Sequence, residues 1–94
     1  MQDLEQAFAD RGLKRGGCLL FHSAEAVDFI EAARQRQQPV LGIDSFIITE
    51  TTTEPLMEHI LDLSVSGLPD DTWSEARRFV EERRDSGFMF EICI

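Results

Sequence analysis

VLGIDSFIIT, residues 40–49, is a run of β-branched and aromatic residues with apolar side chains at both alternating positions. This composition predicts an interior strand, or a strand bent at Gly42. Residues 59–65 alternate between apolar and polar side chains, and residues 88–94 place phenylalanine or isoleucine at every second position. The sequence therefore predicts a sheet that includes these three segments.

Three other segments have helical periodicity. Residues 3–11 carry a short apolar stripe, and a second helix over about residues 24–37 must end before Pro39, because the residue preceding proline is disfavoured in the α region. Thr72 and Glu75 match the capping box that begins a helix, so a third helix starts there. Residues 51–55 and 66–71 separate these elements as a loop and a turn.

The apolar run at residues 18–21 distinguishes two topologies. If it is a strand, the order after the first helix is βαββαβ, as in the ferredoxin-like split βαβ arrangement, and Cys18 would lie near Cys93. If it is not, the fold is a three-stranded antiparallel sheet with helices on one face. Both are α+β folds, and 94 residues without a linker or repeat predict a single domain over residues 1–94.

The net charge of −9 is concentrated in the middle of the chain. Residues 37–76 contain eight acidic residues and no lysine or arginine, whereas the rest of the chain is nearly balanced. Such a field opposes binding to nucleic acid and anionic lipid and accelerates encounter with a cationic partner. The alternative is that the acidic residues only promote solubility.

We expect a cationic protein to bind at the loops and helix start of this segment. An aromatic side chain beside acidic ones suits a basic protein surface, although Trp73 is also a natural core anchor at the start of a helix. The predicted partner-binding residues are Glu50, Glu54, Glu58, Asp70, Asp71, Trp73 and Glu75. Asp44 is set apart, because alternation places it on the same face as Phe46 and predicts partial burial.

The sequence predicts no catalytic residues, no metal ligands and no cofactor. Neither histidine nor cysteine occurs at the spacing of a zinc site, redox motif or activated nucleophile, and no phosphate-binding loop is present. Asp44, Asp62 and Glu91 would bind Mg²⁺ or Ca²⁺ only if their strands bring them onto one face, and the simpler interpretation is three solvent-facing carboxylates. Cys18 and Cys93 are expected to be reduced and buried.

The chain contains no apolar run long enough to span a bilayer, and residues 1–5 lack the basic start of a secretion signal. The expected compartment is the cytoplasm.

PVLGIDSF at residues 39–46, HILDLS at residues 59–64 and the helix that starts at Trp73 resemble small immunity proteins of bacterial polymorphic-toxin systems. The resemblance extends loosely over residues 22–94. It implies a cytoplasmic antidote that binds a cognate toxin, often a nuclease, and blocks it without chemistry of its own.

The sequence thus predicts a non-enzymatic protein-binding module, an immunity protein that inhibits a cationic toxin through an acidic surface. The alternative is a homodimeric or regulatory α+β domain. In the split βαβ order, residues 88–94 would form an exposed edge strand through which two copies could pair.

Overall fold

The computed structural model describes residues 3–63 and 71–94, which form an α+β fold. The helical elements are α1 (Leu4–Phe8), η1 (Ala9–Arg11, a 3₁₀ turn), α2 (Ser23–Gln35) and α3 (Thr72–Glu82). The strands are β1 (Leu13–Arg15), β2 (Cys18–Leu20), β3 (Gly42–Ile48), β4 (Thr53–Asp62) and β5 (Met89–Cys93). No helix within the described ranges has the length and hydropathy needed to span a bilayer.

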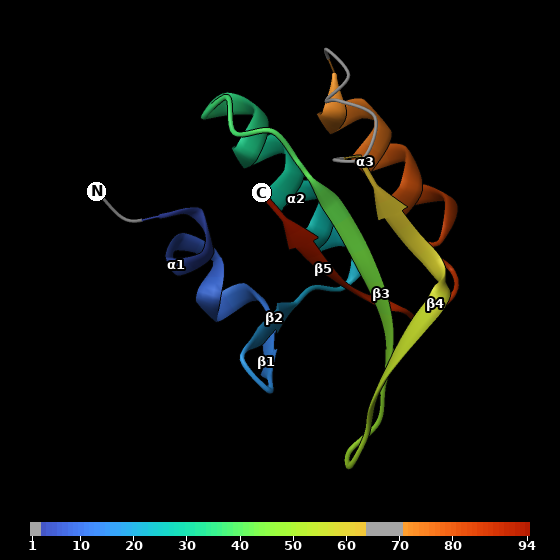
Figure 1. The fold of residues 1–94 in the computed structure, drawn as a ribbon. Helices are drawn as coiled ribbons and strands as arrows, with labels where there is room; N and C mark the ends of the chain where they lie inside the picture. Colours follow the sequence, from blue (N-terminus) through green and yellow to red (C-terminus); the bar gives the residue numbers. More distant parts are fainter. Residues whose placement is uncertain (1–2, 64–70) are drawn as a thin grey trace.

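The strands form two antiparallel sheets, a β1–β2 hairpin and a three-stranded sheet in the order β4–β3–β5. Helices α2 and α3 cover one face of the larger sheet and leave the other face open (Figure 1). The interior position predicted for residues 40–49 is confirmed, since β3 pairs with a strand on each side. The α+β class is confirmed, and the larger sheet is that of the second predicted topology.

The ferredoxin-like order is not found, although residues 18–20 do form a strand. Gly16 and Gly17 adopt φ angles of 56° and 87°, which suit a two-residue hairpin turn, so β2 pairs with β1 instead of entering the main sheet. The sequence reading missed β1. Phe21, the residue after β2, bridges to β5 of the larger sheet through two 2.8 Å hydrogen bonds, in which it exchanges N–H and C=O groups with Phe90.

The core lies between the sheet and its covering helices. Phe90 and Ile92 of β5 are buried, as the alternation predicted, and they share the helix-facing side of the sheet with Ile43. Phe21 and Phe29 of α2 pack with ring centroids 5.1 Å apart. The opposite side of the sheet carries Asp44 and the other alternate residues of β3 and β5.

Strand β4 begins at Thr53, so the prediction of a loop over residues 51–55 is wrong at its end. Pro55 is tolerated there because β4 is an edge strand, where a missing N–H does not interrupt a ladder on both sides. A register shift separates the pairs that β4 makes with Asp44 and Phe46, and the β3–β4 hairpin projects beyond the helices (Figure 1). The predicted strand end at residues 64–65 and most of the 66–71 turn lie outside the described residues.

Helix α3 is capped one residue earlier than the sequence predicted. Asp71 is the N-cap, and its carboxylate accepts from the Ser74 amide at 2.9 Å. Thr72 is buried instead, and its hydroxyl accepts a 3.0 Å hydrogen bond from the Val40 amide. The hydroxyl therefore joins the start of α3 to the segment that leads into β3.

Candidate functional site

The acidic residues that the sequence grouped together lie at two separate places. Glu50, Glu54 and Glu58 belong to the β3–β4 hairpin and its edge strand. Asp71 and Glu75 lie at the start of α3, which is at the opposite end of the sheet from the hairpin tip (Figure 1). Asp70 lies outside the described residues.

At the start of α3, the predicted side chains have structural partners. Hydrogen bonds from the Ser74 hydroxyl and amide lower the pKa of Asp71, and Glu75 forms an ion pair with Arg78 at 2.5 Å. Trp73 is half-buried against the core, and its indole N–H donates to the Gln38 carbonyl at 2.8 Å. These contacts give Asp71, Trp73 and Glu75 roles within the fold, so their positions need no partner protein to explain them.

The β3–β4 hairpin presents a different surface. Seven of the ten residues of β4 are exposed and none is buried, and Met57 is 75% and Ile60 41% accessible. Glu54 and Glu58 are exposed on the same strand, and among residues 3–63 and 71–94 only β3 pairs with β4. The outer edge of β4 is thus unpaired by any described strand and carries apolar side chains and carboxylates, a combination that suits an added strand from a partner.

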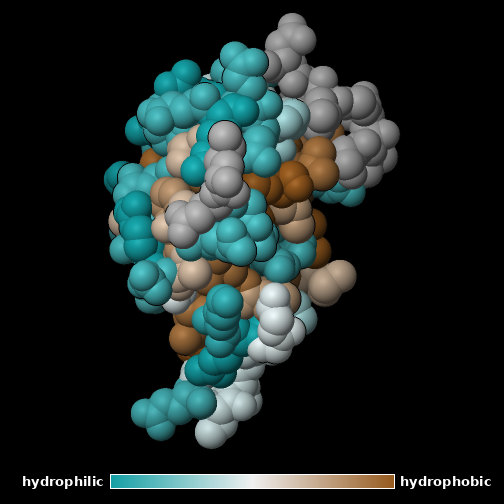
Figure 2. Space-filling model, turned by 90° about the vertical axis from the view of Figure 1, so that its left-hand side faces the viewer, coloured by the Kyte–Doolittle hydropathy of each residue, from teal (hydrophilic) through white to brown (hydrophobic). Residues whose placement is uncertain are grey.

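Arg15 contacts the turn end of this hairpin. Its guanidinium donates to the Thr49 carbonyl at 2.9 Å and to the Thr53 hydroxyl at 3.4 Å. Figure 2 shows the molecule from the side of α1, where hydrophobic residues are exposed among hydrophilic ones. The lower part of this view is hydrophilic to intermediate in hydropathy. The contacts of Arg15 link the orientation of the projecting hairpin to the smaller β1–β2 sheet.

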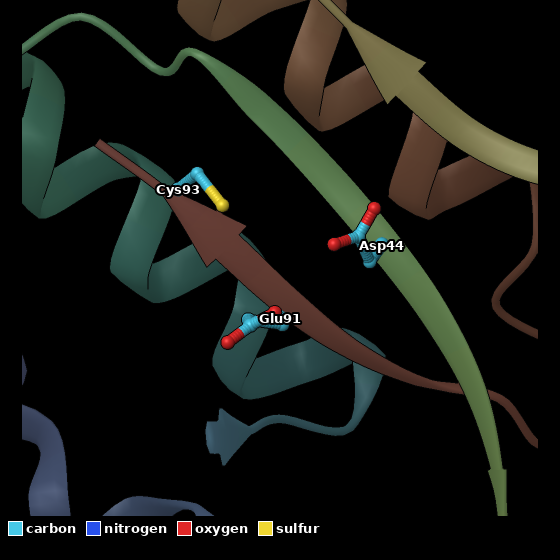
Figure 3. Close-up of side chains that lie close together, drawn as sticks. All are labelled: Asp44, Glu91 and Cys93. Carbon is cyan, nitrogen blue, oxygen red and sulfur yellow. The ribbon is translucent and has the colours of Figure 1, made fainter. Parts of the chain in front are cut away.

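A second cluster lies on the open face of the sheet. Ligand atoms of Asp44, Glu91 and Cys93 all lie within 4.8 Å of one another, on the side away from α2 and α3 (Figure 3). Register explains the meeting, because Asp44 of β3 is directly opposite Glu91 of β5. Of the three carboxylates considered in the sequence, Asp44 and Glu91 do converge, whereas Asp62 is outside the cluster. Asp44 is half-buried, as predicted.

The two thiols are close to these carboxylates. Hydrogen bonding to Glu91 raises the pKa of Cys18, with further increases from burial and from the charges of Glu91, Asp44 and Cys93. Burial raises the pKa of Cys93 first, followed by the charges of Glu91, Asp44 and Glu5. Both cysteines are free, and neither is buried as the sequence predicted, because Cys18 is partly exposed and Cys93 is exposed. Alternation could place Asp44 and Glu91 on strands, but only the strand order shows that they meet Cys93.

A shallow depression of about 230 Å³ adjoins the cluster. Asp44 and Cys93 line it together with Gly42, Ile60 and Asp62. A Cβ atom at Gly42 would lie 2.8 Å from the Leu61 carbonyl oxygen, so the close approach of β4 favours glycine at this position.

His59 has a structural environment. Its Nδ1 accepts from the Arg83 guanidinium at 3.2 Å, and its ring lies 5.1 Å from that of Phe88. His22 is exposed at the start of α2. The two histidines lie on different elements. Neither belongs to the group of Asp44, Glu91 and the two cysteines, which we call the thiol–carboxylate cluster.

Comparisons of this chain with protein-family models, with curated proteins and with solved structures gave no match.

Proposed function

We propose that this protein is a non-enzymatic protein-binding module that receives an extended cationic segment of its partner along β4. The observation that carries the proposal is the open edge of β4, a ten-residue strand on which Met57 and Ile60 are exposed beside Glu54 and Glu58. An added strand would take its affinity from main-chain hydrogen bonds and its specificity from alternate side chains.

Charge favours a basic partner. Residues 37–76 carry no lysine or arginine, and Arg15, at the turn end of the hairpin, is already engaged with Thr49 and Thr53. The carboxylates of β4 would pair with basic side chains of the incoming strand, while Met57 and Ile60 would pack on its apolar ones.

The sequence resemblance supports a specific biological role for this binding. We propose that the protein acts in the cytoplasm as an immunity-type inhibitor and that its partner is a toxin, because a nuclease active site is cationic and an acidic edge complements it. Occluding such a site would require no catalysis by the inhibitor.

The experiment is to identify whether a gene adjacent to this one encodes a toxin-like domain and, with that purified product, to carry out a binding titration. Calorimetry should show a one-to-one complex that weakens as salt rises from about 0.05 M to about 0.3 M. The double variant Glu54→Gln/Glu58→Gln should bind at least about tenfold more weakly, as expected for the loss of two close charge pairs. The matched variant Asp10→Asn/Glu25→Gln removes two negative charges from η1 and α2 and should bind as the wild type does.

Equal losses in both double variants would show that only net charge matters, and no binding at low salt would refute the inhibitor role. Homodimerisation is the competing proposal, because the outer side of β5 is engaged at Phe90 by Phe21 alone among the described strands. Like charges on Glu54 and Glu58 disfavour pairing of two copies of β4. Sedimentation showing a dimer at all concentrations would favour the homodimer.

A further inference from the structure

The thiol–carboxylate cluster draws its donors from three strands. Asp44 comes from β3, Glu91 and Cys93 come from β5, and Cys18 of β2 approaches Glu91 from the smaller sheet. Backbone pairing fixes these positions, since Asp44 opposes Glu91 and Gly42 opposes Cys93. The three donors on β3 and β5 are therefore held together by the register of the larger sheet.

The charges of this cluster are uncompensated. Among the described residues, no lysine, arginine or histidine forms an ion pair with Asp44 or Glu91, whereas several exposed carboxylates of the helices do have basic partners. Glu5 of α1 places a further negative charge close enough to Cys93 to raise the pKa of its thiol. A bound divalent cation would reverse this repulsion.

The donor types indicate which cation fits. Two thiolates and two carboxylates carry the same total charge as the four thiolates of a structural zinc site, and thiolates select thiophilic metals over Mg²⁺ and Ca²⁺. With Zn–S near 2.3 Å and Zn–O near 2.0 Å, neighbouring tetrahedral ligand atoms lie about 3.5 Å apart. The ligand atoms of Asp44, Glu91 and Cys93, which lie within 4.8 Å of one another, would have to close by about 1 Å, and the exposed Cys93 and half-exposed Glu91 can do this by bond rotation. Cys18 is outside this group of three and would join it from its position beside Glu91.

We propose that Cys18, Asp44, Glu91 and Cys93 form a binding site for a thiophilic divalent cation, with Zn²⁺ as the metal that the donors fit. The adjoining depression, lined by Asp44 and Cys93, gives the ion access from solvent. The sequence showed neither thiol at a zinc-motif spacing because the ligands are distributed over the two ends of the chain.

The test uses untagged, fully reduced protein, with Zn²⁺ followed by calorimetry and Co²⁺ by absorption. One ion should bind per chain, and Co²⁺ should give the sulfur-to-metal charge-transfer band and intense visible bands of a tetrahedral thiolate site. Cys93→Ser should remove the charge-transfer contribution of its sulfur and weaken Zn²⁺ binding at least about 100-fold, since even outer partners of metal ligands contribute 10- to 100-fold. Asp44→Asn should weaken it at least about tenfold.

Asp62→Asn is the matched control, because Asp62 lines the same depression outside the cluster, and it should change Zn²⁺ affinity no more than about threefold. Circular dichroism of each variant confirms that the fold is intact. The proposal would be overturned if the protein bound no Zn²⁺. It would also be overturned if neither Cys18→Ser nor Cys93→Ser changed the binding, because the ion would then be held adventitiously by surface carboxylates. Binding of Mg²⁺ that depends on Asp44 but not on Cys93 would overturn the thiophilic assignment.

Discussion

Two buried hydroxyl groups differ in whether they have a hydrogen-bond partner. The Thr72 hydroxyl accepts from the Val40 amide, whereas the fully buried Ser45 hydroxyl on β3 has no partner among the described residues. Removing one polar group of a buried pair leaves the other unsatisfied, but removing an unpaired group leaves nothing behind. The two positions thus form a natural comparison.

We predict that Thr72→Val lowers the free energy of unfolding by about 1–3 kcal/mol, because the Val40 amide loses its acceptor. Ser45→Ala should be neutral or stabilising by up to about 1 kcal/mol. Urea denaturation of the two variants measures both values, and Thr72→Ser, which retains the hydroxyl, serves as the control. Destabilisation of Ser45→Ala comparable to that of Thr72→Val would contradict this account.

At the scale of an element, the cap of α3 makes stability depend on pH. The hydrogen bonds from Ser74 lower the pKa of Asp71 below its ordinary value, so the ionised form is favoured in the folded state. This contribution is fully present above the ordinary pKa of aspartate and is lost as the pH falls through that value toward the lower folded one.

Asp71→Ala should lower the melting temperature at pH 7 by roughly 4 °C, the usual effect of losing a helix N-cap in a domain of this size. The difference from the wild type should shrink as the pH falls from about 5 to about 3. Asp71→Asn keeps a good N-cap without the charge, so its difference from Asp71→Ala should stay constant with pH. Thermal denaturation across this range checks both, and a wild-type difference that does not change with pH would disprove the role of the Asp71 charge.

The elements themselves were largely predictable, and their partners were not. Alternation and helical periodicity are local signals, and they identified β3, β5 and the three helices. The sequence did not reveal strand β1, because three residues are too few to show an alternating pattern. It also did not reveal the start of β4, because Pro55 is compatible with a strand only at a sheet edge, and the sequence does not show which strands are edges.

The candidate site was predictable to a similar degree. Asp44 and Glu91 are two of the three strand carboxylates whose convergence the sequence left open, and their meeting with Cys93 depends on long-range strand order. The sequence also left open whether the acidic residues of the middle segment share one surface, and in the structure the β3–β4 hairpin and the start of α3 extend to opposite ends of the sheet (Figure 1). Proximity in the sequence does not give direction in space.

At the scale of the whole molecule, the net charge of −9 opposes compaction. We predict that raising NaCl from about 0.02 M to about 0.5 M increases the melting temperature by about 3 °C or more, because salt screens this repulsion. The increase should be smaller for Glu54→Gln/Glu58→Gln and unchanged for Arg84→Gln/Asp85→Asn, which keeps the net charge. Differential scanning calorimetry measures the response, and an identical increase in all three proteins would argue against charge repulsion as its cause.

The bridge between Phe21 and Phe90 also sets an order of events during synthesis. Its two residues are about 70 positions apart, whereas the β1–β2 and β3–β4 hairpins close over short connections. Both hairpins can therefore form while the chain is still emerging from the ribosome, but the backbone bridge from Phe21 to the larger sheet cannot form until residues 89–93 arrive. Until then the apolar side of β3 lacks one of its neighbours and Asp44 has neither Glu91 nor Cys93 beside it, so a metal-loaded cluster would mark a chain whose folding is complete.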